Sequence, residues 1–250
     1  RSSDLSEPGN ETAHRAGANH CDAIAGFDTQ LPQHAWLQAG WPAWSAIAGD
    51  AKAWPAQHSA PHRQRGGRSE GVQLLHSFLN QRAAQYRGGI SSPLTAVSAC
   101  SRLSPYLALG ALSLKEVVQA SMAEHATPSA AGSIRQGVQG FVSRLHWHCH
   151  FIQKLESEPP IEWRNMHRGY DGLRAECWGS EETARFERLI AAQTGWPLVD
   201  ACVVMLRETG WLNFRMRAML VSFASYHLWL HWREPGLFLA RQFLDFEPGI

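Results

Sequence analysis

The stretch from Thr194 to Trp211 reads TGWPLVDACVVMLRETGW and has the marks of a single helix. Pro197 stands where the first helical turn tolerates a missing N–H, and Gly210 follows the last apolar position, where helices commonly end. Apolar residues at helical spacing recur on both sides of this stretch, and no segment after Ser69 alternates apolar and polar residues as a strand does. The sequence therefore predicts an all-α fold.

Other helices follow from the same signals. An apolar stripe at Val72, Leu75, Phe78 and Leu79 predicts a helix that ends before Gly88. Ser113 with Glu116 has the spacing of a capping box, which predicts a helix start. Further helices are expected over residues 132–155, 181–192 and 213–233, and a helical pattern starts again at Leu237. The segment 213–233 is apolar nearly all round, which is typical of a buried core helix.

Composition divides the chain into two parts. Residues 1–65 mix Gly, Pro, Ala, Ser and His with little periodicity, which predicts a poorly ordered linker or the remnant of a preceding domain. Four tryptophans between positions 36 and 54 argue against complete disorder there. Residues 66–250 form the predicted helical domain.

Charge and cysteine content exclude several classes of protein. The net charge of +1, from 23 basic and 22 acidic residues, supplies no global field for nucleic acid, so DNA contact would need a local patch. The five cysteines contain no Cys-x-x-Cys pair, which disfavours a disulfide framework or a cysteine-rich zinc site and favours a reducing cytoplasm. The apolar run 218–230 is shorter than the ~20 residues that cross a bilayer. We expect a cytoplasmic monomer without a membrane anchor.

Residues 100–108 read CSRLSPYLA. Ser101 and Ser104 precede a helical run and could offer hydroxyl and N–H groups to phosphates, although such serines more often only cap a helix. This block, the stretch 194–211, Arg215 with Arg217, and Trp232 with Arg233 follow one another in the order found in photolyases and cryptochromes, and the chain resembles that family from about Gly66 to Ile250. The resemblance implies the family's helical FAD-binding domain, truncated at its C-terminus, and finds no counterpart of the family's N-terminal α/β antenna domain.

The resemblance also implies residues that bind FAD. Tyr86 and the segment Cys100, Ser101, Arg102, Leu103 and Ser104 would hold the pyrophosphate, with Cys100 in place of the usual threonine. Arg217 and Asp245 would pair beside the isoalloxazine ring, although the same pair could simply join two helices. Glu247 would be a second acid near the flavin, and Phe141 replaces a tryptophan that lies on the cofactor.

A second set of residues would contact damaged DNA. Trp147 stands where photolyases stack the flipped-out pyrimidine dimer, and Arg215 lies in a matching block. Arg144, His148 and Phe214 replace an acid, an arginine and an asparagine of the dimer-repair enzymes, so flavin binding is better supported than dimer repair. A zinc site at His146 and His150 is the weaker interpretation of this segment, because His148 points elsewhere on a helix and no nearby carboxylate completes the set.

Two tryptophans are candidates for electron transfer. Trp232 matches the middle member of the family's tryptophan chain, and Trp178 lies one residue from the expected surface member and should be exposed. Packing in the core is the alternative role of Trp232.

The resemblance thus implies repair of pyrimidine dimers in DNA by light-driven electron transfer from reduced FAD. A cryptochrome-like photoreceptor that binds FAD without repair is the first alternative. A helical fragment that binds neither FAD nor DNA is the second.

Overall fold

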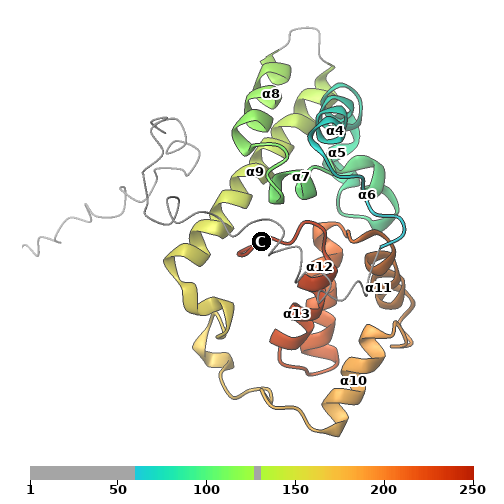
Figure 1. The fold of residues 1–250 in the computed structure, drawn as a ribbon, viewed down its shortest axis with the longest axis vertical. Coiled ribbons are helices and arrows are strands. Elements are labelled where there is room, and N and C mark those ends of the chain that lie inside the picture. Colours follow the sequence, from blue (N-terminus) through green and yellow to red (C-terminus); the bar gives the residue numbers. More distant parts are fainter. Residues whose placement is uncertain (1–59, 127–130) are drawn as a thin grey trace, which may run out of the picture. The chain divides into compact units, whose positions relative to one another are not determined.

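The computed structural model describes residues 60–126 and 131–250, which lie in one compact unit, Pro42–Ile250. Residues 1–59, most of the predicted linker, lie outside the described residues. Within the described ranges the chain is helical and contains no strand, as the sequence predicts (Figure 1). No described helix is long and apolar enough to cross a membrane.

The helices follow one another as short and medium-length segments. In chain order they are α4 (Arg68–Asn80), η1 (Arg82–Gln85), α5 (Tyr86–Gly89), α6 (Pro93–Ala99), α7 (Ser104–Ala108), α8 (Leu114–Ala126), α9 (Gly132–Ser157), η2 (Pro159–Glu162), η3 (Arg168–Tyr170), α10 (Ser180–Ile190), α11 (Pro197–Thr209), α12 (Phe214–Ser222), η4 (Phe223–His227) and α13 (Arg233–Gln242). The predicted helices at 132–155 and 181–192 are confirmed, and so is the helix between Pro197 and Gly210, whereas the short helices from η1 to α7 carry too few apolar positions to show a period.

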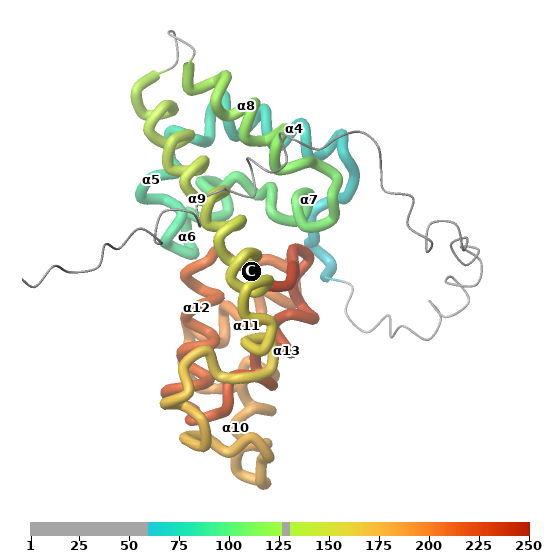
Figure 2. Tube along the Cα trace, turned by 90° about the vertical axis from the view of Figure 1, so that its left-hand side faces the viewer, coloured from blue at the N-terminus to red at the C-terminus, as the bar shows by residue number. Residues whose placement is uncertain are grey.

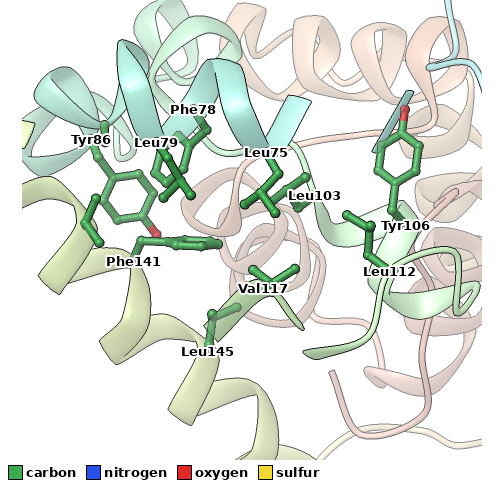
Figure 3. Close-up of a cluster of buried hydrophobic side chains, with 12 residues drawn as sticks. Leu75, Phe78, Leu79, Tyr86, Leu103, Tyr106, Leu112, Val117, Phe141 and Leu145 are labelled. Atoms are coloured by element: carbon green, nitrogen blue, oxygen red, sulfur yellow. The ribbon is translucent and has the colours of Figure 1, made fainter. Parts of the chain in front are cut away.

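The first hydrophobic core lies between α4, α8 and the N-terminal half of α9. The predicted stripe of α4 supplies Leu75, Phe78 and Leu79 to this core, and Val117 and Val138 enter it from α8 and α9. Figure 3 shows Tyr86 of α5 and Phe141 of α9 meeting beside Phe78. Their rings pack edge to face, with centroids 4.8 to 5.9 Å apart, which fixes the position of α5 against α9.

Gly137 allows α9 to approach η1 closely. A Cβ atom at this position would lie 1.7 Å from the carbonyl oxygen of Ala83, a distance that no side chain can tolerate. The contact brings the backbone of α9 against the segment that carries Arg82 and Tyr86.

The second core is formed by α10 to α13. Its buried residues are Leu189, Val199, Cys202, Val203, Leu206, Leu212, Met216, Leu220, Phe223, Ala224 and Leu239. Gly210 ends α11 in the left-handed conformation that the sequence predicts, with φ of 65°. We call the helices around the first core, α4 to α8, the first helix group, and α10 to α13 the second helix group. Figures 1 and 2 both show α9 running from the first helix group toward the second.

The single helix predicted over 213–233 is wrong. The α-helix ends at Ser222, the π-helical turn Phe223–His227 follows, and Trp229 adopts a positive φ of 57°. Arg174 supports this break, because its guanidinium lies 4.5 Å from the Trp229 ring and its Nε donates a 2.7 Å hydrogen bond to the carbonyl oxygen of Ser225. The helical spacing of apolar residues does not reveal such a turn, since the turn depends on contacts with the distant Arg174.

Candidate functional site

Arg82 holds the segment that was predicted to bind phosphate. Its guanidinium donates hydrogen bonds to the carbonyl oxygens of Cys100 and Ser101, the second at 3.2 Å. It also donates to the carbonyl oxygen of Leu74 at 3.0 Å and to the hydroxyl of Ser77 at 3.1 Å. One side chain, at the start of η1, therefore fixes the path of residues 100–101.

Arg102 occupies a strained position in the same segment. Its φ is 64°, in the left-handed region, and its guanidinium lies 3.8 Å above the ring of Trp211. Its Nε donates a 2.9 Å hydrogen bond to Gln64, which donates back to the Arg102 carbonyl oxygen at 3.0 Å. Burial lowers the pKa of Arg102 to about 10, partly offset by Cys100 and Asp245, so the side chain remains a cation at neutral pH.

Arg217 and Asp245 form the predicted ion pair. Nη2 of Arg217 lies 2.6 Å from Oδ2 of Asp245, whose side chain is 1% exposed. Arg217 Nε donates to the Leu212 carbonyl oxygen at 2.9 Å, and its guanidinium lies 4.0 Å from the Phe243 ring. Oδ1 of Asp245 is buried and finds no hydrogen-bond partner among the described residues, which leaves one acceptor free for a ligand.

These elements converge at Cys100. Burial raises the pKa of the Cys100 thiol to about 11, against the opposing fields of Arg102, Arg82 and Arg217. Arg217 comes from α12 of the second helix group, and Asp245 acts on Arg102 of the first. Arg82, Arg102 and Arg217 therefore all act on Cys100, whereas the one carboxylate, Asp245, pairs with Arg217 and acts on Arg102, so the site has an excess of positive charge that suits a diphosphate.

Three of the predicted FAD-binding side chains lie in the first core. Leu103 and Phe141 are buried there, and so is Tyr86, whose hydroxyl has a pKa raised chiefly by burial (Figure 3). Ser101 accepts a 3.4 Å hydrogen bond from the Leu103 amide, and Ser104 begins α7 partly exposed. Leu103 and Phe141 are thus part of the core next to the 100–104 segment. Ser101 and Ser104 remain partly exposed, so a ligand could reach them.

The C-terminal segment lies against α9. Oε2 of Glu247 is 2.8 Å from Nε2 of His148, and Gly249 approaches the backbone of Phe151 and Ile152. Nδ1 of His148 is buried with no partner in the described ranges. Two positions predicted for different ligands, His148 for DNA and Glu247 for FAD, therefore contact one another.

The remaining predicted DNA-binding residues are exposed. Trp147 is 49% exposed and Phe214 68% exposed, and Arg144 and Arg215 also face solvent. Asn213, in contrast, is buried, and its side-chain amide donates to the carbonyl oxygens of Ile90 and Ser91 at 3.0 and 3.2 Å. Asn213 thus connects the two helix groups.

Trp178 and Trp232, the two candidates for electron transfer, lie outside the 100–104 segment in the sequence. Trp232 precedes α13, so it does not end a long helix as expected, and its Nε1 donates a 3.0 Å hydrogen bond to Asn165. Trp178 is partly buried rather than exposed, because it packs on Phe186 with ring centroids 5.1 Å apart. In the described part of the chain no ring contact joins Trp178 to Trp232, and no group of three His, Cys, Asp or Glu side chains is placed to hold a metal ion.

Sequence reasoning missed Arg82 and Trp211 as parts of the site. Trp211 belongs to a quoted motif, but nothing in the motif indicates that it lies under Arg102. Arg82 stands four residues before Tyr86, and its hydrogen bonds to residues 100 and 101 are visible only in the folded chain.

Comparison with known proteins identifies relatives of this chain. The family model described as "FAD binding domain of DNA photolyase" matches residues 141–250. The deoxyribodipyrimidine photo-lyase of Streptomyces griseus is 32% identical over 189 residues, which are 76% of this chain and 37% of that protein. The chain spans a little over a third of the length of such relatives.

Solved structures give the same fold. A cryptochrome from Synechocystis is 25% identical with a TM-score of 0.63, over 76% of this chain and 38% of that one. An archaeal photolyase from Sulfolobus tokodaii, solved with two FAD molecules, is 28% identical with a TM-score of 0.58, over 74% of this chain and 37% of that one. The chain therefore belongs to the photolyase and cryptochrome family and carries helices of its FAD-binding domain.

Proposed function

We propose that this chain binds FAD as part of a photolyase-like protein that acts by blue light on pyrimidine dimers in DNA. The observation that carries the proposal is the convergence of the 100–104 segment with the Arg217–Asp245 pair, two motifs more than 100 residues apart in the sequence. In this proposal residues 66–250 form the FAD-binding domain.

The residues present fit FAD in two respects. Arg82, Arg102 and Arg217 exceed the single charge of Asp245, so a diphosphate beside the 100–104 segment would neutralise a positive site. The unpaired Oδ1 of Asp245 could accept a hydrogen bond from a flavin N–H. FAD, when bound, would supply light absorption and electron donation.

The protein residues would position the cofactor and the DNA. The hydroxyl groups of Ser101 and Ser104 would donate hydrogen bonds to the diphosphate. Tyr86 and Phe141, buried in the core, would hold the segment that carries these serines in place. Arg217 and Asp245 would hold a fixed dipole beside the flavin ring, and the contact between His148 and Glu247 would close the site against α9. Trp147 would offer its exposed face to a base that has left the DNA stack.

A photoreceptor that binds FAD without repair is the second candidate. Arg144, His148 and Phe214 favour it, because all three replace polar groups with which the family's repair enzymes read the dimer. His148 is, in addition, engaged by Glu247.

One experiment separates the two functions. The protein, reconstituted with FAD and chemically reduced, is illuminated with a single-stranded oligonucleotide that carries one cyclobutane dimer, and the restored pyrimidines are quantified by chromatography. Light-dependent restoration supports the photolyase-like function. Stable FAD binding without restoration of any dimer supports the photoreceptor, and a folded protein that takes up no FAD contradicts both.

A further inference from the structure

The segment of residues 60–66 precedes α4 and contacts both helix groups. The amide of His62 donates a 2.8 Å hydrogen bond to the carbonyl oxygen of Glu208, near the end of α11 in the second helix group. Three residues later, the carbonyl oxygen of Arg65 accepts a 2.6 Å hydrogen bond from the hydroxyl of Tyr106, on α7 of the first helix group. We call residues 60–66 the strap.

Gln64 turns toward the protein, unlike its neighbours in the strap. Every residue from Pro61 to Ser69 is exposed except Gln64, which is partly buried. Its Oε1 accepts a 2.9 Å hydrogen bond from Nε of Arg102, and its Nε2 donates a 3.0 Å hydrogen bond to the Arg102 carbonyl oxygen. The primary amide of glutamine carries an acceptor and donors on one planar group, which suits this double contact. One side chain therefore holds both the backbone and the guanidinium of Arg102.

Arg102 needs this support because its backbone is strained. Its φ of 64° lies in the left-handed region, which costs free energy for a residue with a Cβ atom and persists only where surrounding contacts impose it. Gln64 supplies two of these contacts. The buried ring of Trp211 supplies a third, since its centroid lies 3.8 Å from the guanidinium carbon of Arg102. The strap and the second helix group thus fix a residue between two helices of the first helix group.

The conformation of Arg102 shapes the 100–104 segment for an anion. Leu103, the next residue, is right-handed, with φ of −91° and ψ of −10°. A left-handed residue beside a right-handed one turns successive backbone N–H groups toward one side, which creates a concave site for anions. In the described part of the chain the N–H groups of Arg102 and Ser104 donate no hydrogen bond. These two donors are available to a diphosphate as long as Arg102 keeps its left-handed backbone.

We propose that Gln64 is a positioning residue of the FAD site, which keeps Arg102 left-handed against Trp211 and thereby keeps the N–H groups of the 100–104 segment directed at the diphosphate. The inference rests on the proposed function, because it adds to the same site a residue that acts through Arg102. It also extends the FAD-binding unit beyond residues 66–250, since the strap supplies one of the supports of the site.

A double-mutant cycle on the full chain tests the proposal. The affinity for FAD is measured by quenching of flavin fluorescence for the wild type, Gln64→Met, Arg102→Gly and the double variant. Methionine has a similar length to glutamine but offers no amide donor or acceptor, and glycine adopts a positive φ without strain. The matched control is Gln73→Met, because Gln73 is exposed on α4 and its side chain takes part in no hydrogen bond among the described residues.

We expect Gln64→Met to lower the affinity for FAD about tenfold or more, the effect of losing a hydrogen bond to a charged group, and the control to match the wild type. In the Arg102→Gly background the same change should alter the affinity by less than about twofold, because the residue that Gln64 positions is gone. An equal loss in both backgrounds shows that Gln64 does not act through Arg102 and overturns the inference. Wild-type affinity in Gln64→Met also overturns it.

Tyr106→Phe separates positioning of Arg102 from anchoring of the strap, and this comparison stands even if Arg102→Gly binds FAD too weakly to measure. The change removes the hydrogen bond to the Arg65 carbonyl oxygen and leaves both hydrogen bonds between Gln64 and Arg102. Positioning predicts a clearly smaller loss of FAD affinity in Tyr106→Phe than in Gln64→Met, and equal losses overturn the inference.

Urea unfolding of the FAD-free variants records any loss of stability separately from the loss of affinity. If Gln64 only stabilises the fold, its effect on FAD affinity follows the unfolding midpoint and is the same in both backgrounds of the cycle, which overturns the inference and leaves the proposed function intact. A folded wild-type protein that binds no FAD contradicts the proposed function itself, and the inference with it.

Discussion

Arg217 contacts Asp245 across 28 residues of sequence, through a 2.6 Å hydrogen bond that leaves the carboxylate almost fully buried. Replacing Arg217 by glutamine should destabilise the protein by about 3–5 kcal/mol, because it leaves the Asp245 charge buried and unpaired. The variant should also lose FAD. Urea unfolding and the flavin absorbance of the purified protein measure the two effects.

Arg233→Gln is the matched control for this change. Arg233 lies 3.9 Å from Glu234, and both side chains are about half exposed, so its loss should cost no more than about 1 kcal/mol. Equal FAD occupancy in the two variants would show that the Arg217–Asp245 pair is not at the flavin site.

The close contact between α9 and η1 predicts that Gly137→Ala is severely destabilising. The added Cβ would overlap the Ala83 carbonyl oxygen, so the helix must move away from the segment that carries Arg82 and Tyr86. Gly132→Ala, with nothing within 4 Å of its Cβ, should be neutral or slightly stabilising. Chemical denaturation of both variants decides the matter, and equal midpoints would contradict the packing described here.

The environment of Cys100 predicts a pH dependence. Burial raises its pKa to about 11, so the folded protein retains a proton that the unfolded chain loses near pH 8.5. The stability this provides is complete below about pH 8.5 and is lost as the pH rises through 11. Alkylation of Cys100 in the folded protein, followed by peptide mass spectrometry, should therefore keep accelerating from pH 9 to pH 10.5. A plateau near pH 9 would contradict the raised pKa.

Repair of a cyclobutane dimer should be weak or redirected even with FAD fully bound. Arg144, His148 and Phe214 replace groups that would hydrogen-bond the dimer, and a pocket loses discrimination when its polar groups change. Trp147→Ala should still lower the affinity for single-stranded DNA, by about 1–3 kcal/mol if one stacked base is lost. Rapid repair on duplex DNA, measured by the chromatographic assay, would show that these substitutions carry little weight.

Local signals in the sequence explain what could be predicted of the fold. Pro197 and Gly210 mark the ends of α11, and the amide of Glu116 bonds the hydroxyl of Ser113 at 3.1 Å, as its spacing predicts. The break at Trp229 was missed, since it depends on Arg174, which lies more than 50 residues away and holds the π-helical turn.

In the candidate site, too, contacts between distant segments could not be predicted from local patterns in the sequence. The Arg217–Asp245 contact was predicted through resemblance to a family, not through any local pattern. The contacts of Arg102 with Trp211 and of His148 with Glu247 join segments about 100 residues apart, and neither residue type nor spacing indicates them. Such contacts require the three-dimensional fold.

The most direct test of the account is a titration of the purified protein with FAD, monitored by quenching of flavin fluorescence, in parallel with Arg217→Gln and Arg233→Gln. The account predicts saturable binding of one FAD per chain by the wild type and by Arg233→Gln, and a large loss of affinity in Arg217→Gln. A folded wild-type protein that binds no FAD, or that binds it as well after Arg217→Gln, would contradict the account.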